Sequence, residues 1–178
     1  MSLFENPTQA VGIFAFLATF LSCLLAGRMT NRVIWPWLAI IYLVFALELV
    51  VGLRHGLRMT VNDVMQSADF YDERASIQWM LVAFLMACVL ILPALYRISK
   101  SKLGPLPKNH FAAIMATVIL LLLFVLELIS FHQVDALLYH ISGGIMVIAW
   151  MWVAMAFVAV TAALIAIACR SNPSLKDN

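Results

Sequence analysis

The stretch FALELV, Phe45–Val50, places a glutamate inside an apolar run, and it recurs as FVLELI at Phe124–Ile129. The two glutamates, Glu48 and Glu127, are 79 positions apart. A charged side chain at the centre of a membrane span costs about 3 kcal/mol, and such residues usually face a bundle interior or mark a functional path. The recurrence therefore raises the question of whether both runs cross a membrane and whether their carboxylates share a site.

The amino-acid composition is that of a membrane protein. Of the 178 residues, 65% are hydrophobic and 11% are charged, against about 45–50% apolar and about 25% charged residues in soluble domains. The net charge of +2, with no Lys/Arg cluster interleaved with aromatics, argues against a nucleic-acid partner. The expected partner is the lipid bilayer. All three cysteines fall inside apolar runs, so neither a disulfide framework nor a cysteine metal site is expected.

Five apolar runs approach the length of about 20 residues that a helix needs to cross a bilayer. They are 11–27, 33–53, 77–96, 111–131 and 143–169. The sequence therefore predicts an all-α fold, a single polytopic membrane domain over residues 1–178 with five transmembrane helices. The segment 54–76 is expected to form a short helix at the outward interface, because Thr60 and Asp63 fit the start of a capping box.

The distribution of Lys and Arg predicts the orientation of the bundle. One side of the membrane receives eight of these residues and the other side receives three. The eight are Arg28, Arg32, Arg97, Lys100, Lys102, Lys108, Arg170 and Lys176, and the three are Arg54, Arg58 and Arg74. The positive-inside rule then puts the N-terminus outside and the C-terminus in the cytoplasm. The short chain carries no basic region before its first span, which argues against a cleaved signal and favours a bacterial inner (plasma) membrane.

Ionisable residues gather at the outward end of the predicted spans. Glu48, Gly52 and His55 fall at i, i+4 and i+7, along one face of a helix. On the fourth span an aspartate follows a histidine by three positions, the arrangement in which a carboxylate orients an imidazole that binds a metal. Imidazole and carboxylate groups suit Zn, Cu, Fe or Mn. The candidate metal ligands are Glu48, His55, Glu127, His132, Asp135 and His140.

The same end could instead hold a haem b. His55 and His132 come from different spans and are candidate axial ligands, and Arg54 and Arg58 are candidate partners of the propionates. A carboxylate beside an imidazole also suits proton transfer, as at a quinol site. The sequence contains neither the Glu-x-x-His pattern of di-iron bundles nor HExxH, so no motif decides between these options.

These observations predict a membrane protein whose outward-facing His/carboxylate cluster binds a metal or haem, or handles protons, within a membrane redox complex. A ligand site requires the glutamates and histidines to converge in the fold. The alternative is a non-catalytic accessory subunit, in which the same residues form separate pairs that join helices and loops. Other membrane subunits or further copies of the chain are the expected protein partners. Whether the protein is an enzyme is left open by the sequence.

Two features of the fifth predicted span concern packing. Trp150 and Trp152 lie deep within it and are expected to pack inside the bundle. Gly143 and Gly144, at its start, are expected to let two helices approach closely.

Overall fold

The structure, a computed structural model, describes residues 6–52, 107–129 and 136–171 and the single positions 56, 83 and 87. Within these residues, four helices are long and apolar enough to cross a membrane, with mean hydropathies of 2.2 to 2.4. The chain is therefore built as a helical membrane protein. The third predicted span, 77–96, and the segment 54–76 fall outside the described residues, apart from those single positions.

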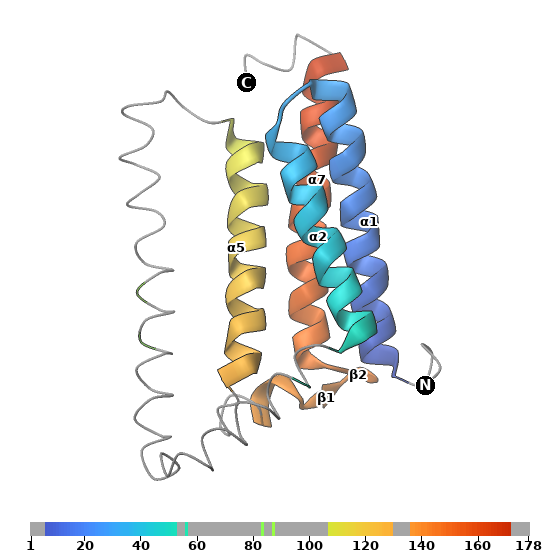
Figure 1. Ribbon diagram of the computed structural model, residues 1–178, viewed down its shortest axis with the longest axis vertical. Coiled ribbons are helices and arrows are strands. Elements are labelled where there is room, and N and C mark those ends of the chain that lie inside the picture. The colour runs from blue at the N-terminus through green and yellow to red at the C-terminus, as the bar shows by residue number, and fades with distance from the viewer. Residues whose placement is uncertain are drawn as a thin grey trace.

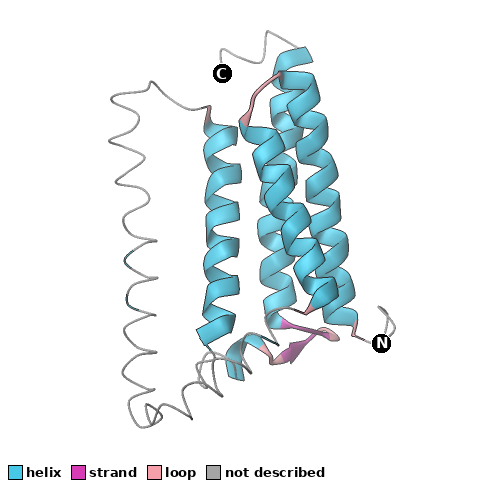
Figure 2. Cartoon of the chain, viewed as in Figure 1, coloured by secondary structure: helices cyan, strands magenta, loops and turns pink. Residues whose placement is uncertain are grey.

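The described part of the chain is almost entirely helical (Figure 2). At about 1.5 Å per residue, its 24-residue first helix is about 36 Å long, enough to cross a hydrocarbon core of about 30 Å. The elements are α1 (Pro7–Thr30), α2 (Ile34–Val51), α5 (Lys108–Ile129), β1 (Ile141–Ser142), β2 (Ile145–Met146) and α7 (Val147–Ser171).

The four long helices stand side by side (Figure 1). Helix α1 packs against α2 and α7, α5 packs against α7, and α2 and α5 also touch. Helices α2 and α5 run in the same direction, and α1 and α7 run in the opposite one. This order places Arg28, Arg32, Lys108 and Arg170 at one end of the bundle, here the basic end. Glu48 and Glu127 lie at the other, here the carboxylate end.

The outer faces of the helices are apolar. On α1, Phe14, Leu17, Leu21 and Leu25 repeat at helical spacing and are 65%, 37%, 62% and 50% exposed. An apolar stripe of this length is unusual on the surface of a soluble monomer, whereas lipid chains cover it at no cost. The exposed surface therefore agrees with the membrane assignment made from composition.

An aromatic cluster forms the core of the bundle near the carboxylate end. It consists of Phe16, Tyr42, Phe45, Phe124 and Trp152, from all four long helices. Phe16 is fully buried, and its ring centroid lies 5.7 to 6.1 Å from those of the other four. Such tilted aromatic contacts add about 0.5–1.5 kcal/mol per pair beyond the burial of area. The cluster therefore joins the four helices about one helical turn further into the bundle than the glutamates.

The segment before α7 is a hairpin rather than the start of a helix. Ile141 pairs with Met146 and Ser142 with Ile145, which leaves Gly143 and Gly144 as the two-residue turn. Their φ values of 65° and 85° are the positive angles that a type I′ turn requires and that glycine adopts without strain. The fifth predicted span thus begins four residues too early, and these glycines do not serve helix packing.

The two tryptophans of α7 differ in their surroundings. Trp152 is 3% exposed, which confirms its predicted place inside the bundle. The same prediction is wrong for Trp150, which is 50% exposed. Its indole Nε1 donates a hydrogen bond of 3.0 Å to the carbonyl oxygen of Ser142. Trp150 therefore lies outside the core and stabilises the hairpin through this hydrogen bond.

Candidate functional site: a cavity between two glutamates

Glu48 lies in the last turn of α2, at the carboxylate end of the bundle. Gly52 ends the helix in the left-handed conformation, and its N–H donates to the carbonyl oxygen of Glu48 at 2.7 Å. The Glu48 side chain is half-buried. The helix end therefore fixes this carboxylate near the membrane boundary rather than at mid-depth.

Glu127 lies two residues before the end of α5 and is only 6% exposed. The hydroxyl of Tyr139 donates a hydrogen bond to Glu127 Oε1 at 3.4 Å. A buried carboxylate is stabilised by donors of this kind, because they replace part of its lost hydration. Tyr139 belongs to the segment that leads into the hairpin, so this bond also joins α5 to the hairpin region.

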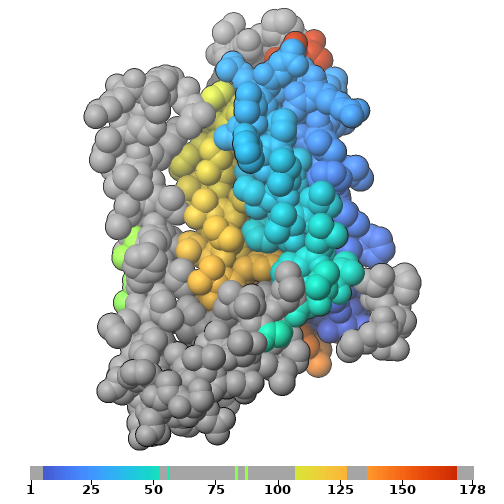
Figure 3. Space-filling view, in the orientation of Figure 1, coloured from blue at the N-terminus to red at the C-terminus, as the bar shows by residue number. Residues whose placement is uncertain are grey.

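The two copies of the sequence repeat meet in space. Phe45 and Phe124, the first residues of FALELV and FVLELI, stack with ring centroids 4.5 Å apart and planes 23° apart. Three residues later along each parallel helix come Glu48 and Glu127. Figure 3 shows side chains of α2 and α5 in contact on the face drawn. Equivalent positions of the repeat are therefore neighbours, and both glutamates line one cavity.

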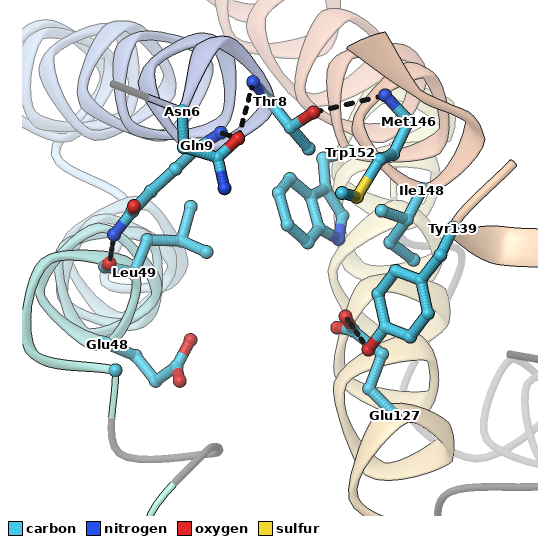
Figure 4. A pocket seen from close by; sticks show the side chains of 11 residues that line it. Asn6, Thr8, Gln9, Glu48, Leu49, Glu127, Tyr139, Met146, Ile148 and Trp152 are labelled. Carbon is cyan, nitrogen blue, oxygen red and sulfur yellow. Dashed lines mark hydrogen bonds between the residues drawn. The ribbon is translucent and has the colours of Figure 1, made fainter. Parts of the chain in front are cut away.

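This cavity has a volume of about 260 Å³ and lies at the carboxylate end of the bundle. Figure 4 shows Glu48 on one side, Glu127 with Tyr139 on the other, and the indole of Trp152 between α1 and these carboxylates. All four long helices and the hairpin contribute to its wall. The lining residues are Asn6, Thr8, Gln9, Glu48, Leu49, Gly52, Glu127, Tyr139, Met146, Ile148 and Trp152.

The first turn of α1 supplies a polar wall that sequence reasoning missed. The side chain of Asn6 caps the helix by accepting from the N–H of Thr8 at 3.1 Å. Thr8 Oγ1 accepts from the N–H of Met146 at 3.1 Å, and Gln9 Nε2 donates to the carbonyl oxygen of Leu49. The run NPTQ carried a signal, because Asn followed by Pro is typical of a helix start. That signal predicts the cap but not its place on the wall of the cavity.

Gly12 positions the indole of Trp152 and thereby the apolar wall of the cavity. A Cβ on Gly12 would lie 2.7 Å from both Trp152 Cε3 and Leu49 Cδ1, closer than real contacts allow. Only glycine therefore lets α1 approach these two side chains, both of which line the cavity. The shape of the cavity depends on this contact between helices.

The structure brings together only some of the residues predicted for the site. Glu48 and Glu127 share the cavity, as a ligand site requires. His140 is exposed, lies directly before β1, and does not line the cavity. Its N–H donates to the carbonyl oxygen of Leu137, and its own carbonyl oxygen accepts from the N–H of Val147. The remaining predicted ligands lie outside the described residues. They are His55, His132 and Asp135, together with the predicted propionate partners Arg54 and Arg58.

Within the described ranges, no three His, Cys, Asp or Glu side chains gather closely enough to hold a metal ion. The metal and haem assignments made from sequence therefore receive no support from this part of the chain, and they stay predictions for the histidines outside it. What the described residues do provide is a pair of carboxylates with aromatic and amide neighbours. Such a group can hold a proton or a cation without a complete metal coordination sphere.

Comparison with known proteins does not add to this description. No protein-family model, no curated protein and no solved structure matches the chain.

Proposed function

We propose that this membrane protein binds and exchanges a proton or a small cation in the cavity between Glu48 and Glu127. The observation that carries the proposal is that glutamates from two different helices line one cavity. Ionisable residues within membrane helices commonly mark ion paths and proton relays. Here both glutamates line a cavity at the carboxylate end of the bundle.

The physical argument concerns the cost of negative charge in an apolar bundle. A carboxylate inside a membrane protein needs a proton, a cation or hydrogen-bond donors to offset its lost hydration. Glu127 is 6% exposed and accepts from Tyr139, so part of that stabilisation is built in. A second carboxylate on the same cavity makes the binding of a positive charge more favourable, because both glutamates gain from one cation.

We also propose the finer topology that the charge pattern predicts. The chain would cross the membrane five times, with the carboxylate end outside, the basic end in the cytoplasm and the bacterial inner membrane as its location. The proposal is supported by Arg28, Arg32, Lys108 and Arg170, which lie at one end of the described bundle. A tag at the N-terminus should then be accessible to protease on spheroplasts, and one at the C-terminus only after permeabilisation.

The proposed proton exchange is tested by infrared difference spectroscopy of the purified protein between neutral and acidic pH. A carboxyl band that appears on acidification should be lost in Glu127→Gln and altered in Glu48→Gln. Asp177→Asn, which changes an acid near the C-terminus, should leave that band unchanged. Identical difference spectra in wild type and in both glutamate variants would refute proton exchange at this cavity.

A place in a membrane redox complex is the wider role that we propose for the protein, with His55 and His132 as the metal or haem ligands. An absorption spectrum and elemental analysis in mild detergent test this. A Soret band, or near-stoichiometric metal that is lost in His55→Ala or His132→Ala, would establish such a centre. A colourless, metal-free protein that copurifies with larger membrane subunits would favour the accessory role.

A further inference from the structure

The cavity between the glutamates is larger than a proton or a bare metal ion requires. Its volume of about 260 Å³ lies just below the range of about 300–1,000 Å³ that is usual for small-molecule pockets. A site that holds a bare ion is normally closed around it by its ligands. The size of the cavity therefore fits a small organic ligand better than a bare ion.

The wall of the cavity combines negative charge with aromatic rings. Trp152 and Tyr139 line it together with both glutamates, and Figure 4 shows the indole of Trp152 between Thr8 and the carboxylate-bearing side chains. The face of an indole attracts cations, and a cation that carries methyl groups gains most because it sheds water easily. Glutamate and tryptophan in one cavity are thus complementary to an organic ammonium ion.

The polar groups from α1 are engaged in holding the wall together. Gln9 Nε2 donates to the carbonyl oxygen of Leu49, and Thr8 Oγ1 accepts from the N–H of Met146. These bonds fasten the start of α1 to α2 on one side and to the hairpin on the other. The two bonds therefore hold together the part of the wall that α1 shares with α2 and the hairpin.

We propose that the cavity binds a small organic ammonium ion, such as a methylated amine, with its charge near Glu48 and Glu127 and its methyl groups against Trp152. This inference rests on the proposed function and narrows it from cations in general to organic ones. A hydrated sodium or potassium ion keeps its water and gains little from an indole face. The site therefore discriminates by the aromatic wall as well as by charge.

Isothermal titration calorimetry of the full-length protein in mild detergent tests this inference. Choline should bind, whereas its uncharged isostere, in which carbon replaces the nitrogen, should not. Replacing potassium gluconate with sodium chloride at equal ionic strength should change the affinity for choline little. Glu127→Gln should abolish binding, because the buried carboxylate is lost.

The aromatic wall is tested by substitutions of tryptophan. Trp152→Leu should weaken choline binding about tenfold, equivalent to about 1.4 kcal/mol, and Trp152→Phe should weaken it less. Trp37→Leu is the matched control, because Trp37 lies on the exposed face of α2 and is 63% exposed. If Trp152→Leu does not fold, the comparison of choline with its isostere on wild type, together with Trp152→Phe, decides the matter.

The outcomes separate this inference from the proposed function. Absence of choline binding, with the infrared signal of Glu127 intact, would overturn the organic ligand and leave proton exchange standing. Equal binding of choline and its uncharged isostere would show a merely apolar pocket and would also overturn the inference. If the wild-type protein shows neither a heat of choline binding nor the infrared signal of Glu127, both the inference and the proposed function are overturned.

Discussion

Phe45 and Phe124 stack with their ring centroids 4.5 Å apart, and they occupy equivalent positions of the two FxLEL-like runs. The contact sets the register of two parallel helices. Because the register is fixed at this pair, the glutamates three residues further along, Glu48 and Glu127, reach one cavity. The arrangement explains how two carboxylates 79 positions apart in the sequence come to line one cavity.

The aromatic stack is expected to contribute strongly to stability. Phe124 is 6% exposed and contacts Phe16, Phe45 and Trp152, so Phe124→Ala removes a large buried side chain. We expect a loss of about 3–5 kcal/mol in the free energy of unfolding. Thermal and denaturant unfolding in mild detergent measures it. The matched control is Phe157→Ala, since Phe157 is 69% exposed and should cost under about 1 kcal/mol. Equal losses for both variants would contradict the packing described here.

Gly12→Ala is expected to reshape the cavity without touching its charges. The new methyl group would lie 2.7 Å from side-chain atoms of Leu49 and Trp152, so these must shift. We expect a loss of about 1–3 kcal/mol in stability and weaker choline binding. Gly56→Ala is the control, because a Cβ there meets nothing within 4 Å, and its effect should stay within about 0.5 kcal/mol. Unchanged binding in Gly12→Ala would show that Trp152 does not shape the site.

Two tyrosine hydroxyls should have separable effects. Tyr139→Phe keeps the ring but removes the donor to Glu127 Oε1, so ligand binding should weaken about two- to tenfold. Tyr42→Phe removes the hydrogen bond of 3.4 Å with Thr117 Oγ1, in the aromatic core. It should lower stability by about 1 kcal/mol and leave binding unchanged. Calorimetry and unfolding of both variants provide the comparison, and the reverse pattern would contradict the assigned roles.

The hairpin is expected to depend on Thr8 of α1. Thr8→Val removes the acceptor of the Met146 N–H and leaves that amide without its side-chain partner, at a cost of about 1–3 kcal/mol. Hydrogen exchange at the Met146 amide should accelerate. Thr161→Val is the control, because the Thr161 hydroxyl is exposed and donates to the carbonyl oxygen of Phe157 within its own helix. Slow exchange at Met146 in Thr8→Val would rule out this contact as the anchor.

Much of the fold follows from the sequence alone. Apolar runs of about 20 residues predict membrane helices because the bilayer leaves the backbone no other way to satisfy its hydrogen bonds. The described helices α1, α2, α5 and α7 agree with four of the five predicted spans. The hairpin at 141–146 was not predicted, because two-residue strands leave no periodic pattern and the glycine pair also suits helix packing.

The candidate site was predictable only in part. Glu48 and Glu127 stood out because charge is rare in apolar runs, and the structure places both on one cavity. The contributions of Gln9 and Trp152 could not be predicted, because they depend on how α1 and α7 are rotated against α2 and α5. Rotation is set by side-chain packing between helices, such as the contact at Gly12, rather than by any pattern within one helix.

The central claim is that Glu48 and Glu127 act on one bound proton or cation, and infrared titration of a double-mutant cycle tests it most directly. The carboxyl band of Glu127 would be followed against pH in wild type and in Glu48→Gln, and the band of Glu48 in wild type and in Glu127→Gln, with the double variant as baseline. A shared site predicts that removing either glutamate changes the titration of the other. Titrations that are identical with and without the partner would contradict the claim, because the two carboxylates would then act independently.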